Sequence, residues 1–332
     1  MRRRFLAVVL ALPVIVANTL PARASGEPGP VDPTAPQVPP NFTAAAFARG
    51  LDHPGPILVL PNGDVLVAVR DGVTLLRDAD GTGTADAEIP LIADLGQPLG
   101  LVLRRDKLYV ATAEALHACT FFVGRQRIGG NCHPIATWPD DAGKPVRGGL
   151  TFNRDETLLY VALAGGKDPA GIWALRPDGK SAHLQATLAA TALALEPSKG
   201  TVWTTDSGVA LVAPGDEAIA RVPIRAHGPV TGLTFYGRDR YPKEYRGGLF
   251  VAEGGAGESA PPRISYVAFA GARPAAEVTP FAGGFQRGRP DALATSRDGA
   301  LLVADEARGT VWRIAFRCGA CTPDPEPPVR RR

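Results

Sequence analysis

Three aspartates lie close together in one polar segment and could bind a divalent cation. Asp78, Asp80 and Asp86 occupy positions 1, 3 and 9 of a loop that resembles a calcium-binding loop of the EF-hand type, with Gly83 at position 6. Ile89 stands at position 12, where such a loop needs a bidentate glutamate. The segment therefore predicts either a weak Ca²⁺ site or an Asp- and Gly-rich turn.

Four cysteines form two pairs that are local in sequence. Cys119 and Cys132 flank a glycine-containing segment that is typical of a β-hairpin, which predicts a disulfide that clamps this hairpin. Cys318 and Cys321 form a CxxC motif after the last predicted strand, with no helical pattern behind it and Thr322 as the next residue. We expect a structural disulfide or unreactive thiols there, rather than a redox centre or a haem-attachment motif.

The N-terminus has the pattern of an export signal. Three arginines at 2–4 precede an apolar run at 5–17, and small residues follow at Ala22 and Ala24. The sequence predicts a signal peptide over residues 1–24, a periplasmic or secreted location, and no stable membrane span after cleavage. A Pro-rich linker is expected over 25–40.

The charge of the expected mature chain argues against nucleic-acid binding. Removing residues 1–24 deletes four arginines and no acidic residue, so the formal charge falls from +3 to −1. The remaining basic residues are scattered among acidic ones, whereas a nucleic-acid-binding protein concentrates them in a patch. Residues 318–332 comprise the CxxC motif and a Pro-rich end, and the end, residues 322–332, is expected to form a disordered tail.

A strand-turn-strand unit recurs six times between these terminal segments. Each copy has an apolar run, a polar turn and a second apolar run, and most successive turns lie roughly 40 to 50 residues apart, as in propeller blades. The second run is nearly all apolar, which indicates a strand buried on both faces. The copies cover residues 57–68, 99–111, 150–162, 193–204, 233–252 and 293–304.

These repeats predict an all-β fold, a six-bladed β-propeller over residues 41–317. We expect the strand after each turn to line a central channel, and the loops beyond these strands to form a funnel. The mouth of this funnel is the expected binding site.

Several segments resemble the soluble pyrroloquinoline quinone (PQQ)-dependent glucose and sorbosone dehydrogenases, which are six-bladed propellers. The resemblance is carried by residues 50–68, 97–101 and 288–314, and most specifically by Tyr-Pro-Lys-Glu-Tyr-Arg-Gly-Gly at the start of 241–252. It covers residues 41–316. It implies hydride transfer from the C1 carbon of a sugar to PQQ, with Ca²⁺ as a further cofactor and a separate electron acceptor.

The resemblance also implies positions for the site residues. In that family a Gly-His-x-x-Arg run before the third repeat supplies the general base. The corresponding run here has Lys144 at the position of the histidine and Arg147 at its end. Arg147 and Arg263 are the cationic contacts expected for the cofactor. None of the five histidines occupies that position, but His53 and His227 precede repeats and could face the funnel.

Three functions remain open from the sequence. The chain is either a divergent PQQ-dependent sugar dehydrogenase or a non-catalytic propeller that binds a ligand or partner in its funnel. A third possibility is a lactonase-type propeller whose metal would be held by Glu253, Asp206 and Asp305, because carboxylates are the ligands that such a centre needs.

Overall fold

Short apolar strands joined by polar turns make up nearly all of the described structure. The computed structural model describes residues 32–138, 147–164, 171–206, 210–213, 220–223, 228–257, 259–271, 273–285 and 287–317. Within these ranges the only helical elements are two single turns of 3₁₀ helix, η2 (Lys243–Tyr245) and η3 (Glu306–Arg308). All the described strands belong to the compact unit Pro33–Arg332.

The described strands form six four-stranded antiparallel sheets. Five of them consist of four strands that are consecutive in the chain. These are β2–β5 (Ile57–Val59, Val65–Val69, Gly72–Arg77, Ala87–Ala93), β6–β9 (Pro98–Arg104, Lys107–Thr112, Ala115–Thr120, His133–Thr137), β10–β13 (Arg147–Phe152, Leu159–Ala164, Gly171–Leu175, His183–Thr187), β14–β17 (Leu193–Leu195, Val202–Asp206, Ala210–Ala213, Ala220–Pro223) and β18–β21 (Val230–Phe235, Leu249–Glu253, Arg263–Ala270, Arg273–Ala282).

The last sheet joins the two ends of the described chain. Its order is β22 (Pro290–Thr295), β23 (Leu301–Asp305), β24 (Thr310–Phe316) and then β1 (Phe42–Arg49). β1 pairs antiparallel with β24 from Phe42 opposite Phe316 to Arg49 opposite Thr310. The first described strand therefore completes the sheet made by the last three.

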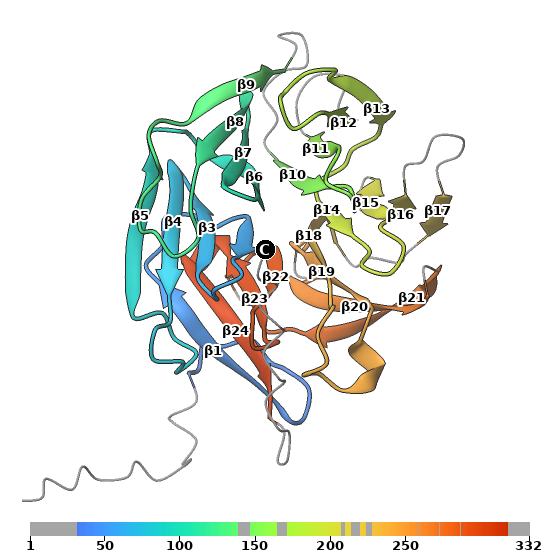
Figure 1. Cartoon of the computed structure of the whole chain (residues 1–332). Helices are drawn as coiled ribbons and strands as arrows, with labels where there is room; N and C mark the ends of the chain where they lie inside the picture. Colours follow the sequence, from blue (N-terminus) through green and yellow to red (C-terminus); the bar gives the residue numbers. More distant parts are fainter. Residues whose placement is uncertain are drawn as a thin grey trace, which may run out of the picture. The chain divides into compact units, whose positions relative to one another are not determined.

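The innermost strands of the six sheets are β2, β6, β10, β14, β18 and β22. Each of them contacts the next in this order, and β22 contacts β2, so that they form a closed ring. Figure 1 shows the sheets radiating from this centre. The prediction of an all-β propeller is confirmed.

One detail of the prediction is wrong. The fully apolar strand after each turn is the second strand of its sheet, not the one that lines the axis. β3, for example, is buried along nearly its whole length, whereas β2 is half-buried. The second strand is apolar because neighbouring sheets cover both of its faces, and the strand before the turn reaches the axis.

Glycines allow the innermost strands to approach one another. A Cβ atom on Gly100 of β6 would lie 2.5 Å from Cβ of Leu150 in β10, and one on Gly232 of β18 would lie 2.7 Å from the carbonyl oxygen of Asp291 in β22. Real Cβ atoms do not come so close to other heavy atoms. The small residue at these positions thus sets the spacing of adjacent sheets near the axis.

The segment before β1 is attached to the sheets from about residue 33 onward. Gln37 and Gly283 exchange backbone hydrogen bonds of 2.8 and 2.9 Å, and Ala35 and Val38 pack against a buried aromatic cluster. The expected linker over 25–40 is thus fixed to the surface over the part that the structure describes.

The predicted disulfide between Cys119 and Cys132 is confirmed, with a Cα–Cα distance of 4.3 Å. It joins β8 to the residue before β9, and the segment between the two cysteines is the loop of the β8–β9 hairpin. Cys318 and Cys321 lie outside the described residues.

The Tyr-Pro-Lys-Glu-Tyr motif lies between the last two sheets. Tyr241 is fully buried, and its hydroxyl donates to the carbonyl oxygen of Ile314 at 2.6 Å and accepts from the amide of Leu301 at 3.0 Å. Its ring stacks on Tyr236 at a centroid distance of 4.3 Å. Because Ile314 and Leu301 face each other in β24 and β23, one side chain from the β18–β19 connection fastens the neighbouring sheet.

We predict that Tyr241→Phe lowers the free energy of unfolding by about 2 kcal/mol, because it leaves a buried amide and a buried carbonyl without their partner. Tyr245→Phe is the matched control: Tyr245 belongs to the same aromatic cluster, but its hydroxyl makes no hydrogen bond among the described residues. Urea denaturation of both variants measures the difference. Equal losses would contradict the assignment.

Candidate functional site

A cavity of about 250 Å³ lies where the innermost strands begin, and every sheet contributes to it. We call it the axial pocket. Because these strands all start at the same end of the ring, the residues at or just before their first positions surround the axis. The lining residues are Pro56, Gln97, Pro98, Leu99, Arg147, Gly148, Thr191, Thr231, Arg289, Asp291 and Glu306.

An ion pair crosses the axis inside this pocket. Nη1 of Arg147, at the start of β10, lies 3.0 Å from Oδ1 of Asp291 in β22. The two sheets are three places apart in the ring of six and so stand opposite each other. The side chains are 31% and 21% exposed, so water can reach the pair from the mouth of the pocket. Burial raises the pKa of Asp291, while the neighbouring Arg147 and Arg289 oppose that rise.

A second ion pair lies beside the first. Arg289 directly precedes β22, and its Nη2 contacts Oε2 of Glu306. Its Nε is buried and has no hydrogen-bond partner. A buried N–H without an acceptor is costly, so this atom is one unfavourable feature of the pocket wall. Burial, with a contribution from Arg147, lowers the pKa of Arg289.

Two threonines of the lining tie neighbouring sheets together. The hydroxyl of Thr191 donates to the carbonyl oxygen of Val230 at 2.7 Å. The hydroxyl of Thr231 donates to the carbonyl oxygen of Pro290 at 2.7 Å. Each bond joins one sheet to the next near the axis. The pocket wall is therefore held by side chains that also close the ring.

The structure brings one of the three predicted catalytic and cofactor residues into this pocket. Arg147 is part of its lining. Lys144 lies outside the described residues. Arg263, at the start of β20, is not among the lining residues: its Nε donates to Oε1 of Glu253 at 3.1 Å. Its role as a cofactor contact stays a prediction.

The sequence analysis did not single out three charged residues of the pocket, Arg289, Asp291 and Glu306. Arg289 lies in a segment that carried the family resemblance, and Asp291 follows it two positions later. A signal was present, since a polar residue at the start of an innermost strand must face the axis or its rim. The expectation that the second strand of each unit lines the axis pointed away from these residues.

The described histidines lie elsewhere. His53 is exposed and contacts Asp52 and Arg70, with 2.7 Å from its Nδ1 to Asp52 Oδ1. His117 lies in β8, where burial lowers its pKa. His133 and His183 begin β9 and β13. His227 lies outside the described residues.

The carboxylates proposed for a lactonase-type metal do not form a group within the described ranges. Glu253 is fully buried and accepts hydrogen bonds from Arg263, Ser265 and the amide of Gly228. Asp305 is also buried, and it accepts from the amide of Arg289 at 2.8 Å. These side chains hold loops in place.

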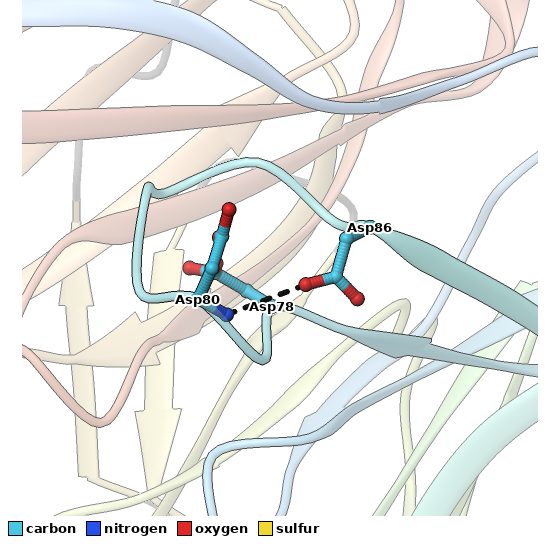
Figure 2. A group of neighbouring side chains, drawn as sticks. All are labelled: Asp78, Asp80 and Asp86. Carbon is cyan, nitrogen blue, oxygen red and sulfur yellow. Dashed lines mark hydrogen bonds between the residues drawn. The ribbon is translucent and has the colours of Figure 1, made fainter. Parts of the chain in front are cut away.

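Asp78, Asp80 and Asp86 do come together, in the turn between β4 and β5, with carboxylate oxygens within 4.8 Å of one another (Figure 2). Their oxygens already accept amide hydrogens: Asp78 accepts from Thr82 and Gly83 at 2.9 Å each, and Asp86 accepts from the amide of Asp80 at 3.3 Å, drawn as a dashed line. Hydrogen bonds, with Thr82 first, lower the pKa of Asp80. Ca²⁺ binding by this loop stays a prediction.

Comparisons with known proteins find the fold in solved structures. No family model matches the chain, and no curated protein matches it in sequence. A structure of a family AA12 carbohydrate-active enzyme from Trichoderma reesei is similar, with TM-score 0.69, 15% identity and coverage of 85% of this chain and 98% of that one.

Two sugar dehydrogenases are also similar. One is the PQQ-bound aldose sugar dehydrogenase of Streptomyces coelicolor, with TM-score 0.61 and 17% identity, covering 84% of this chain and 99% of that one. The other is the apo form of the aldose sugar dehydrogenase of Escherichia coli, with TM-score 0.61 and 16% identity, covering 83% and 100%. The resemblance expected from the sequence is confirmed as a likeness of fold. The chain is a propeller of the architecture found in these enzymes.

One further negative finding concerns membranes. None of the helices in the described ranges has both the length and the apolar character needed to cross a bilayer.

The β4–β5 turn generates a prediction of its own. Asp78→Ala removes the acceptor of two backbone amides, so we expect it to lower the free energy of unfolding by about 1–2 kcal/mol in the presence of EDTA. Glu88→Gln, which changes an exposed carboxylate of β5, is the control and should leave stability unchanged. Thermal denaturation with EDTA and with CaCl₂ measures both. If Asp78→Ala loses stability only when Ca²⁺ is present, the loop is a cation site and not a self-supporting turn.

Proposed function

We propose that this chain is an exported six-bladed propeller that binds a small, neutral, polyhydroxylated molecule, such as a sugar, in its axial pocket without catalysing hydride transfer. The proposal includes a signal peptide over residues 1–24 and a propeller domain over residues 41–317. The observation that carries it is the charge balance of the pocket: each described arginine of the lining contacts a carboxylate of the same lining.

Paired charges suit a ligand rich in hydroxyl groups. A sugar hydroxyl can donate to a carboxylate oxygen and accept from a guanidinium N–H at the same time. Arg147 and Asp291 present these two kinds of group side by side, and Arg289 and Glu306 form a second such pair in the same lining. Gln97 supplies an amide that can both donate and accept. A neutral ligand can use these groups without separating either ion pair.

The described pocket does not fit PQQ. PQQ is a polycarboxylate, so binding it requires cations in excess of acids. Both described cations of the lining, Arg147 and Arg289, are already matched by Asp291 and Glu306. A polyanion would have to displace these carboxylates or be repelled by them.

A PQQ-dependent sugar dehydrogenase is the second candidate function. It is favoured by the fold shared with the PQQ-bound enzyme of Streptomyces coelicolor. In that case Lys144 would stand where the general base is expected, with Arg147 beside the cofactor and Ca²⁺ as a further cofactor. Titration of the purified protein with PQQ and CaCl₂, followed by absorbance and by dye reduction with an aldose panel, separates the two candidates. Cofactor uptake with sugar turnover would overturn the binding-only proposal.

We predict that Arg289→Lys weakens sugar binding roughly tenfold, because it keeps the positive charge but removes the planar set of guanidinium N–H donors, which can hold Glu306 and a ligand oxygen at the same time. Arg287→Lys, an exposed position two residues earlier, is the control. Isothermal titration calorimetry with a panel of neutral monosaccharides and disaccharides measures the affinity. Wild-type affinity in Arg289→Lys, or no binding of any sugar, would contradict this assignment.

The role of the charge balance in the axial pocket can be tested by neutralising its two carboxylates. The double variant Asp291→Asn/Glu306→Gln leaves Arg147 and Arg289 without acidic partners, so we expect it to gain affinity for PQQ and other polycarboxylates at low salt. The melting temperature of the double variant should rise with PQQ, and that of the wild type should not. The reverse result would show that the pocket of the wild type already accepts a polyanion.

A further inference from the structure

A second cavity, of about 710 Å³, lies at the other end of the sheets. The axial pocket is lined by the beginnings of β2 and β22, whereas this cavity is lined by the turns at their ends. We call it the basal pocket. It is lined by Phe47, Asn62, Gly63, Asp64, Val65, Asp78, Gly81, Gly83, Arg238, Asp239, Arg240, Ser296, Arg297, Asp298, Gly299 and Arg313.

Asp64 is a carboxylate of the basal pocket, and its charge is balanced by Arg77, which does not belong to the lining. Asp64 accepts from Nε and Nη2 of Arg77 at 2.7 and 2.6 Å, and from the amide nitrogen of Asn62 at 2.7 Å. Only 4% of its side chain is exposed. Burial raises the pKa of Asp64, but the hydrogen bonds from Arg77 and Asn62 outweigh burial, and the pKa is lowered. Asp64 therefore adds little net negative potential to the cavity.

The other three carboxylates of the lining, Asp78, Asp239 and Asp298, also have partners. Asp298 contacts Arg313 of β24 and accepts from the hydroxyl of Ser296 at 2.5 Å. The carboxylate of Asp78 accepts the two amide hydrogens of its own turn. The guanidinium of Arg313 lies over that same turn, since a Cβ on Gly83 would be 3.2 Å from it. These contacts fix the walls of the cavity between the first and last sheets.

Two cations of the lining are not matched in this way. Arg238 and Arg240 lie in the β18–β19 connection, and within the described ranges neither makes an ion pair or a side-chain hydrogen bond. Arg240 lies against the turn at Gly299, since a Cβ added to Gly299 would be 2.5 Å from Cβ of Arg240. The basal pocket thus has two guanidinium groups with free donors at its rim, whereas both cations of the axial pocket are paired.

We propose that the basal pocket is a second binding site, which takes a small molecule bearing an oxoanion group, a carboxylate or a phosphate, held by Arg238 and Arg240. Guanidinium groups bind such planar or tetrahedral anions through parallel N–H···O bonds. The remaining polar wall, with Asn62 and Ser296, suits the uncharged part of the molecule. The cavity volume leaves room for a group the size of a sugar beside the anion.

The experiment compares two variants with the same change in net charge. Arg238→Ala/Arg240→Ala removes the proposed ligands, and Arg125→Ala/Arg127→Ala removes two exposed arginines from the β8–β9 loop. The probes are sodium glucuronate, inorganic phosphate and glucose 6-phosphate, with glucose as the neutral match. Isothermal titration calorimetry at low and moderate salt gives the affinities, and thermal denaturation without ligand checks that both variants fold.

We expect at least one anionic probe to bind the wild type more tightly than glucose does, with affinity that falls as salt rises. We expect Arg238→Ala/Arg240→Ala to weaken this binding by about tenfold or more, and the control variant to keep it. Glucuronate and phosphate alone distinguish a carboxylate from a phosphate ligand. Absence of anion binding overturns the proposal, as does an equal loss in both variants. Binding that is lost in Arg289→Lys instead would place the anion in the axial pocket.

Discussion

The close approach of the innermost strands is the constraint on which the rest of the structure depends. Neighbouring sheets of a propeller converge toward the axis, so the residues there must be small wherever one strand faces the backbone of the next. Gly100 against Leu150 and Gly232 against Asp291 meet this requirement. With the sheets at that distance, the threonine hydroxyls of the axial pocket can bond from one sheet to the next, and Arg147 can reach Asp291 across the ring.

The two pockets differ in electrostatics because they are built from different parts of the repeat. The axial pocket is made by the first residues of innermost strands, whose side chains converge and therefore pair with one another. The basal pocket is made largely by turns, where side chains diverge and can stay unpaired, as Arg238 does among the described residues. One scaffold can in this way present a balanced, largely neutral site at one end and a cationic rim at the other.

The fold could be predicted from the sequence largely because each unit repeats the same pattern of two apolar runs and a turn. The order of strands within a sheet could not, because apolar character reports burial and not distance from the axis. Ile57–Val59 and Val65–Val69 both consist entirely of apolar residues, yet only the former is innermost. A sequence motif marks Arg147 as a candidate site residue. The position of Asp291 and Glu306 in the pocket, by contrast, depends on which strands meet around the ring. The contact between Arg147 and Asp291 joins residues 144 positions apart, which no local pattern encodes.

The pairing of β1 with β24 has a consequence for synthesis. A hydroxyl of Thr43 reaches the carbonyl oxygen of Ala315, 272 positions along the chain. While the ribosome is still making the later sheets, β1 has no strand beside it, and its unpaired backbone offers an edge to any other extended chain. The ring can close only after the last strand has emerged, so folding of this protein should be slow and largely post-translational.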